Sequence, residues 1–144
     1  MGSEGRYAER LARLRAMMAA ERLDGLLCYG NGYRKDFLRY AHPAPTPSPY
    51  GFCLLTPEGG ELFVEAPWDT QPAAETVQQV HGARTPTAVA QRVAARVRAL
   101  ELGPRLGLAG GEVLEAALYD TLREHLGPVE LVPASRAVME LRYV

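Results

Sequence analysis

The sequence predicts an α/β fold in which helices flank a sheet of mixed direction. Apolar residues at helical spacing alternate along the chain with short, continuous apolar runs, and two of these runs are separated by a Pro-Glu-Gly-Gly turn. Continuous apolar runs are typical of strands that are buried on both faces, whereas the short turn predicts an antiparallel hairpin. A sheet that contains both kinds of neighbour, covered by helices, satisfies all of these observations.

The first half of the chain predicts an amphipathic helix, a buried strand and a hairpin. The expected elements are a helix from Tyr7 with Leu11, Leu14 and Met18 on one face, a strand over residues 26–29, one or two helical turns over 36–41, a hairpin of 50–56 with 62–65, and a helix over 67–77. We expect the opening helix to end near Gly25, because glycine readily adopts the left-handed conformation that closes helices. Proline at every second position over residues 43–49 favours an extended path there.

The second half alternates helix and strand more regularly. Its expected elements are a brief strand over residues 80–83, a helix with the stripe Val89, Val93, Val97 and Leu100, a strand over 106–109, a helix with the stripe Val113, Ala117, Leu118, Leu122 and Leu126, a strand over 129–132 and a helix after Pro133. The last helix reaches Val144 without a closing Gly or Asn, so we expect the natural polypeptide to continue.

Length and charge narrow the classes of function. A chain of 144 residues, 47% of them hydrophobic, has the size and balance of one globular domain. The 16 basic and 17 acidic residues nearly cancel, so no overall field attracts nucleic acid or an anionic membrane. No apolar run approaches the ~20 residues that span a bilayer, and residues 1–6 lack a signal-peptide core. We therefore expect a cytoplasmic protein with neither nucleic acid nor membrane as partner.

Cysteines, glycines and histidines give no strong catalytic signal. Cys28 and Cys53 lie in apolar runs without CxxC spacing, which favours buried free thiols, although a cysteine nucleophile stays open as an alternative. The glycine-rich residues 107–111 lie between a strand and a helix, but their spacing fits no phosphate-binding motif and favours an ordinary tight turn. The histidines are scattered, have no convergent partner and are expected at the surface: His42, His81 and His125.

Four segments, in this order along the chain, carry a family resemblance. They are the opening helix and strand from Arg13-Leu14 through Asp24-Gly25-Leu26-Leu27; Gly30-Asn31-Gly32 followed by Phe37-Leu38-Arg39-Tyr40; the hairpin Gly51-Phe52-Cys53-Leu54-Leu55 to Glu61-Leu62-Phe63-Val64; and Val132-Pro133-Ala134-Ser135 to Met139-Glu140-Leu141-Arg142. Together they resemble the N-terminal domain of the creatinase, aminopeptidase P and prolidase superfamily. The resemblance implies a ribonuclease H-like motif over residues 1–133. It also implies that residues 134–144 begin a linker helix to a C-terminal, metallopeptidase-like pita-bread domain.

In that family the chemistry belongs to the C-terminal domain, where two aspartates, one histidine and two glutamates bind a divalent metal pair in the peptidases. The aspartates of this chain are isolated and do not supply that set: Asp24, Asp36, Asp69 and Asp120. The resemblance therefore implies a non-catalytic domain without a cofactor of its own, whose partner is its C-terminal catalytic domain. It also implies a homodimer in which this domain helps to select substrate at the neighbouring subunit's active site. Creatinase needs no metal, so the parent chemistry stays open.

Four residues between the glycine turn and the proline-rich stretch, and one that follows Pro67, are candidates for shaping the substrate: Arg34, Phe37, Arg39, Tyr40 and Trp68. A guanidinium here can hold a substrate carboxylate through two parallel hydrogen bonds, and the tryptophan can line a groove. The alternative is that the aromatic residues pack in the core and the arginines are solvated.

A second class of function is an independent α/β module that binds a small ligand or a protein, of the flavodoxin or receiver type. A receiver needs clustered acidic residues after its first strand, a phosphoacceptor aspartate at the end of a later strand, and a supporting lysine. Here Asp36 and the sole lysine, Lys35, are adjacent in the chain, which argues against a receiver.

Overall fold

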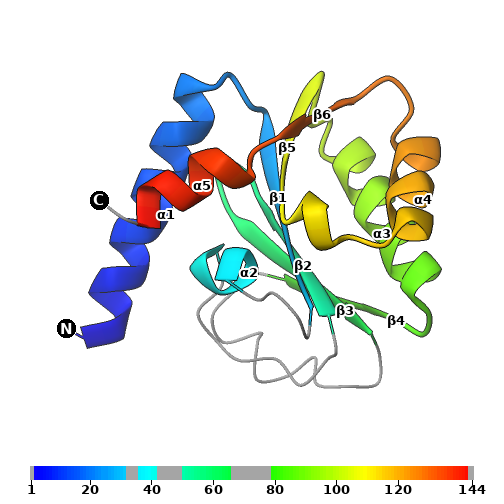
Figure 1. Cartoon of the computed structure of the whole chain (residues 1–144), viewed down its shortest axis with the longest axis horizontal. Helices are drawn as coiled ribbons and strands as arrows, with labels where there is room; N and C mark the ends of the chain where they lie inside the picture. Colours follow the sequence, from blue (N-terminus) through cyan, green and yellow to red (C-terminus); the bar gives the residue numbers. More distant parts are fainter. Residues whose placement is uncertain (1, 32–35, 42–49, 66–78, 143–144) are drawn as a thin grey trace.

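The computed structural model describes residues 2–31, 36–41, 50–65 and 79–142 (Figure 1). Within them a six-stranded sheet has the order β4-β3-β2-β1-β5-β6. The elements along the chain are α1 (Gly2–Ala20), β1 (Gly25–Asn31), α2 (Asp36–Ala41), β2 (Tyr50–Leu55), β3 (Gly60–Glu65), β4 (Gln79–Ala83), α3 (Pro86–Ala99), β5 (Arg105–Ala109), the 3-10 helix η2 (Gly111–Val113), α4 (Ala116–Leu126), β6 (Glu130–Pro133) and α5 (Ser135–Arg142). The expected extended stretch over residues 43–49 and the expected helix over 67–77 lie outside the described residues.

The sheet is mixed, as predicted. β2 pairs antiparallel with both β1 and β3, whereas β1–β5, β5–β6 and β3–β4 are parallel pairs. Every strand except β2 therefore runs in the same direction, and their carboxyl ends lie at one edge of the sheet. Helices α3 and α4 cover one face, and α1, α2 and α5 cover the other (Figure 1).

Burial on both faces explains the continuous apolar runs of the central strands. Successive side chains of a strand point to opposite faces. In β1, Leu26 and Cys28 join the core beneath α1, α2 and α5, while Leu27 and Tyr29 join the core beneath α3 and α4. All four are at most 2% exposed, so this strand has no solvent-facing side that would require polar residues.

The opening helix ends earlier than predicted. α1 stops at Ala20, and Arg22, not Gly25, adopts the left-handed conformation, with φ of 58°. The Leu23 N–H donates to the Met18 carbonyl at 2.8 Å, a bond typical of the Schellman closure of a helix. Gly25 instead begins β1, where a Cβ atom would lie 3.1 Å from Leu106 Cδ1, so its role is close packing within the core.

The helix predicted to include Val113 also begins later. After β5, Gly110 turns the chain with φ of 92°, and a Cβ atom there would collide with the Tyr29 carbonyl oxygen. Val113 then lies in η2, where its carbonyl accepts a hydrogen bond from Asn31 Nδ2 at 3.1 Å. This tertiary bond holds a 3-10 turn where apolar spacing alone predicted α-helix, and α4 starts at Ala116.

The remaining elements agree with the sequence predictions. The hairpin of β2 and β3 is closed by Thr56, whose N–H donates to the Gly59 carbonyl at 2.9 Å and whose Oγ1 accepts from the Gly59 N–H at 3.0 Å. Helix α5 begins at Ser135 and packs against α1 and α2 with Val138 fully buried. The domain boundary expected at residue 133 stays a prediction. Among the described residues, no helix combines the length and apolar character needed to cross a bilayer.

Candidate functional site

The candidate site lies at the edge where β1 and β3 end and β2 begins. Asn31, the last residue of β1, is paired in register with Tyr50, the first residue of β2. The Tyr50 hydroxyl donates to Glu65 Oε1, at the end of β3, over 3.3 Å. Burial and the Glu65 charge together raise the pKa of Tyr50, so this hydroxyl stays a hydrogen-bond donor at neutral pH. Carboxyl ends of strands are where open α/β sheets bind ligands.

Helix α2, at the same edge, carries three of the candidate residues. Phe37 is fully buried and Tyr40 is 8% exposed, and both belong to the core beneath α1 and α5. The Arg10 guanidinium lies 5.7 Å from the Tyr40 ring centroid, within the range of a cation–π contact. The structure thus brings Phe37 and Tyr40 together as residues that anchor α2.

The Tyr40 hydroxyl is buried and has no hydrogen-bond partner, unlike any other described buried side-chain nitrogen or oxygen. Tyr7 of α1 offers a contrast, because its hydroxyl donates to the Ala41 carbonyl of α2 at 3.1 Å. Burial, as the largest cause, raises the pKa of Tyr7 to about 12, so it too remains a donor. A buried hydroxyl without a partner costs about 1–3 kcal/mol, so Tyr40 calls for an explanation beyond packing.

The structure describes the other three candidate residues only in part. Arg34 and Trp68 lie outside the described residues. The backbone of Arg39 belongs to α2, one helical turn after Asp36, but its side chain is outside the description. The proposed roles of these three residues therefore stay predictions, and only Arg39 belongs to the helix whose position is fixed by buried residues.

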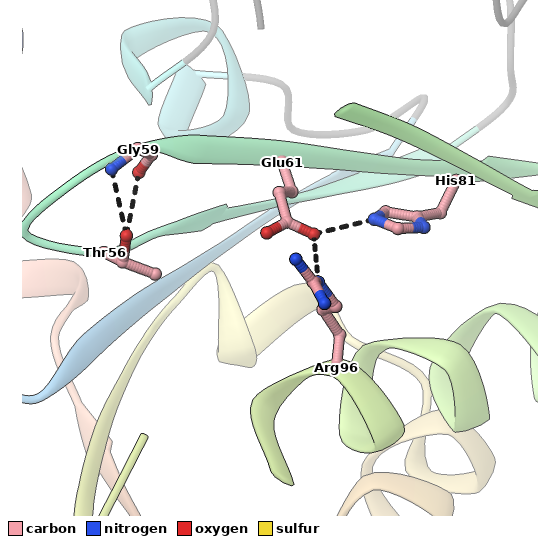
Figure 2. A network of polar contacts seen from close by, with 5 residues as sticks. All are labelled: Thr56, Gly59, Glu61, His81 and Arg96. Carbon is pink, nitrogen blue, oxygen red and sulfur yellow. Dashed lines mark hydrogen bonds and ion pairs between the residues drawn. The ribbon is translucent and has the colours of Figure 1, made fainter. Parts of the chain in front are cut away.

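A polar network that the sequence did not predict joins β3, β4 and α3 (Figure 2). Glu61 Oε1 lies 2.7 Å from His81 Nε2 and accepts a hydrogen bond from Arg96 Nε at 2.7 Å. Burial of Glu61 favours its neutral form, but the bonds from Arg96 and His81 outweigh burial and hold its pKa below the ordinary value of 4.5. The His81 ring also stacks on Phe63, with centroids 4.5 Å apart.

The prediction that His81 is a surface histidine without a partner is therefore wrong. The available signal was Glu61, an acidic residue that directly precedes the apolar residues 62–64 in its strand. Because side chains alternate along β3, Glu61 faces the same side as Phe63, toward α3, and needs a buried partner there. The network connects the edge strand β4 to helix α3 through Glu61 of β3, because His81 and Arg96 both donate to the same oxygen of the Glu61 carboxylate.

The cysteines are buried and free, as predicted, and they are paired in register across β1 and β2. Burial raises the pKa of Cys53 to about 12, and burial together with the neighbouring Cys53 also raises the pKa of Cys28. A nucleophilic cysteine needs a lowered pKa, so these thiols argue against the cysteine-enzyme alternative. In the described part of the chain, no three His, Cys, Asp or Glu side chains are grouped to hold a metal ion.

The topology defines the class of protein first: an α/β domain with one antiparallel strand inside an otherwise unidirectional sheet. Flavodoxin-like modules have the parallel order 2-1-3-4-5, so the structure does not support that alternative. The family follows from comparison, because the model of the Creatinase/Prolidase N-terminal domain matches residues 10–144. The chain belongs to this family.

Solved structures give the same fold. An Xaa-Pro aminopeptidase structure from Streptococcus pyogenes matches with a TM-score of 0.73 and 20% identity, over 96% of this chain and 99% of that one. The N-terminal domain of cytoplasmic peptidase PepQ from Mycobacterium tuberculosis matches with a TM-score of 0.70 and 25% identity, over 93% of this chain and 98% of that one. The Xaa-Pro dipeptidase from Bacillus anthracis matches with a TM-score of 0.70 and 20% identity over 94% of this chain. This chain spans only 36% of the length of that dipeptidase. No curated protein sequence matches significantly.

Proposed function

We propose that this chain is the non-catalytic N-terminal domain of a creatinase-like or Xaa-Pro peptidase-like hydrolase of the cytoplasm. The observation that carries the proposal is the family match over residues 10–144. It is supported by the similar structures of two N-terminal domains, one from PepQ of Mycobacterium tuberculosis and one from a putative metallopeptidase of Corynebacterium diphtheriae. This chain covers 98% of the first and 95% of the second. In the parent protein, a C-terminal domain supplies the chemistry, including the divalent metal pair if it is a peptidase.

Within that parent, the domain contributes to dimerisation and to substrate selection at the partner subunit's active site. The α2 corner, meaning helix α2 and the strand ends beside it, supports this role because α2 is held in place by its contacts with the rest of the domain. Phe37 and Ala41 are fully buried, and Tyr7 bonds the last carbonyl of the helix. Arg39, which belongs to this helix, is proposed to bind a substrate carboxylate, since a guanidinium can donate two parallel hydrogen bonds to the two oxygens of a carboxylate.

The non-catalytic role is tested on the 144-residue chain itself. Incubated with an alanyl-proline dipeptide and Mn²⁺, it is expected to release no proline, whereas a complete Xaa-Pro dipeptidase under the same conditions does. Sedimentation equilibrium at several concentrations then tests dimerisation by this domain, for which we expect a reversible dimer. Metal-dependent release of proline would contradict the non-catalytic role, and a monomer at every concentration would contradict dimerisation through this domain.

Substrate selection is tested in the parent polypeptide with Arg39→Ala. The expected effect is a loss of preference for a free carboxylate. The ratio of kcat/KM for an Xaa-Pro dipeptide to that for its C-terminal amide should fall about tenfold, the value of one charge-assisted hydrogen bond. Arg13→Ala, at an exposed position of α1, is the matched control and should leave the ratio unchanged. An unchanged ratio for Arg39→Ala would exclude this residue from carboxylate recognition.

A further inference from the structure

A half-open groove of about 440 Å³ lies where β5 and β6 end, on the other side of β5 from β1. Its floor is apolar, formed by Leu108 of β5 and Leu131 of β6, and Tyr119 of α4 forms one wall. In Figure 1, η2 leads from β5 toward α4 on one side of these strand ends, and α5 leaves β6 on the other. The volume lies within the roughly 300–1,000 Å³ of pockets that hold small molecules.

Tyr119 gives the groove an unusual wall. It is 39% exposed, and of the described large apolar side chains it is the one that is exposed to this extent. The rest of α4 follows the ordinary pattern, because Leu118, Leu122 and Leu126 are buried beneath it. An aromatic ring kept at the rim of an apolar groove provides contact area for an apolar ligand group at little entropic cost.

Charged residues of both signs, Glu112 and Arg136, line the groove. The Ser135 hydroxyl donates to Glu112 Oε1 at 3.0 Å and accepts from the Gly110 N–H at 2.9 Å, which fixes the carboxylate of η2 beside the first turn of α5. The next residue, Arg136, also lines the groove. Its guanidinium makes an exposed pair with Glu140 at 3.4 Å, a contact of little energetic value that a ligand can replace.

We propose that this groove binds a free α-amino acid with an apolar side chain. The α-carboxylate pairs with Arg136, the α-ammonium pairs with Glu112, and the side chain lies along Leu108, Leu131 and Tyr119. A carboxylate and a guanidinium in the lining of one groove match the two opposite charges that an amino acid carries on one carbon, and the apolar lining residues match its side chain. The site is separate from the α2 corner and does not depend on the proposed function.

The test is a titration of the ¹⁵N-labelled 144-residue chain with L-phenylalanine at pH 7, followed by NMR. We expect saturable shifts of the backbone amides of Gly111, Glu112, Tyr119 and Leu131. Phenylalanine amide, which lacks the carboxylate, and N-acetylphenylalanine, which lacks the ammonium, should each bind about tenfold more weakly. The dipeptide Phe-Phe, whose charged ends lie farther apart, should also bind more weakly than the amino acid.

Variants separate recognition of the charges from simple apolar contact. Arg136→Gln and Glu112→Gln, both at exposed positions, should fold normally and weaken phenylalanine binding about tenfold. Arg92→Gln, exposed on α3, is the control and should bind like the unchanged chain. The proposal is overturned by the absence of saturable shifts, by equal binding of the amide and acetyl derivatives, by unaltered binding in both charge variants, or by tighter binding of the dipeptide.

Discussion

Glu61 and Tyr40 are both buried polar residues, one on each face of the sheet, and they differ in whether their polar atoms have partners. Glu61 is 7% exposed and accepts bonds from two side chains, whereas Tyr40 is 8% exposed and its hydroxyl has no partner. Burial of a polar group stabilises a fold only when its hydrogen bonds are replaced. The Glu61 network is therefore explained by folding alone, and the Tyr40 hydroxyl is not. This difference marks the α2 corner as the place to test the role in substrate selection proposed above.

The largest expected effect is the removal of the Glu61 carboxylate. Glu61→Ala should lower the free energy of unfolding by about 2–3 kcal/mol, because Arg96 and His81 are left half-buried without their acceptor. Urea denaturation at pH 7 measures the loss. The control is Glu130→Ala, in the opposite edge strand, whose exposed pair with Arg105 at 3.5 Å should be worth less than about 1 kcal/mol. Equal losses in the two variants would mean that the network adds nothing beyond a surface ion pair.

The pH dependence of stability should depend on the same carboxylate. The pKa of Glu61 in the folded protein lies below its ordinary value of 4.5, so between these two values the unfolded chain binds more protons. Its contribution is complete above the ordinary value and is lost as the pH falls through the folded value. The stabilising contribution of the ionised Glu61, measured as the difference in unfolding free energy between the wild type and Glu61→Gln, should therefore be present above roughly pH 5 and shrink toward pH 3. Denaturation curves in which the difference stays constant across the whole range would contradict a lowered pKa.

Tyr7 provides a smaller test on the other face. Tyr7→Phe removes the donor to the Ala41 carbonyl and should destabilise the chain by about 1 kcal/mol, the usual value of a neutral hydrogen bond. Thermal and urea unfolding measure the change. No loss of stability would show that the bond from α1 does not anchor α2.

Tyr40→Phe should have the smallest effect and the opposite sign. Deleting a hydroxyl that has no partner removes a desolvation cost, so the variant should be as stable as the wild type or more stable by up to about 1 kcal/mol. The ring contacts, including the one with Arg10, are kept. A loss as large as that of Tyr7→Phe would instead show that the Tyr40 hydroxyl is bonded in solution, and the contrast with Glu61 would disappear.

Most of the fold could be predicted from the sequence because its signals are local. The apolar runs of the strands and the turn after Thr56 are each visible within a few residues. The end of α1 was misplaced because the sequence shows Gly25 but not the bond between Leu23 and Met18 that makes Arg22 the closing residue. Val113 was misplaced for a similar reason, since its carbonyl bonds Asn31, 82 residues away.

The site was less accessible to sequence reasoning than the fold. Glu61 contacts His81 and Arg96, which lie 20 and 35 residues away in the sequence, and no short sequence motif indicates contacts over such separations. Spacing within a six-residue helix also could not decide whether Phe37 and Tyr40 face the core or a ligand, and the structure places both in the core. The roles of Arg34, Arg39 and Trp68 remain predictions from the family resemblance.

Because Cys28 and Cys53 are buried, the reactivity of their thiols can be used to measure unfolding of the chain. Both thiols lie inside the sheet on adjacent central strands, and burial keeps them protonated at neutral pH. A thiol-reactive dye can therefore label them only when β1 and β2 separate from their surroundings. The rate of labelling reports how often the centre of the domain opens, and the same measurement can be made without engineered cysteines in every variant described above.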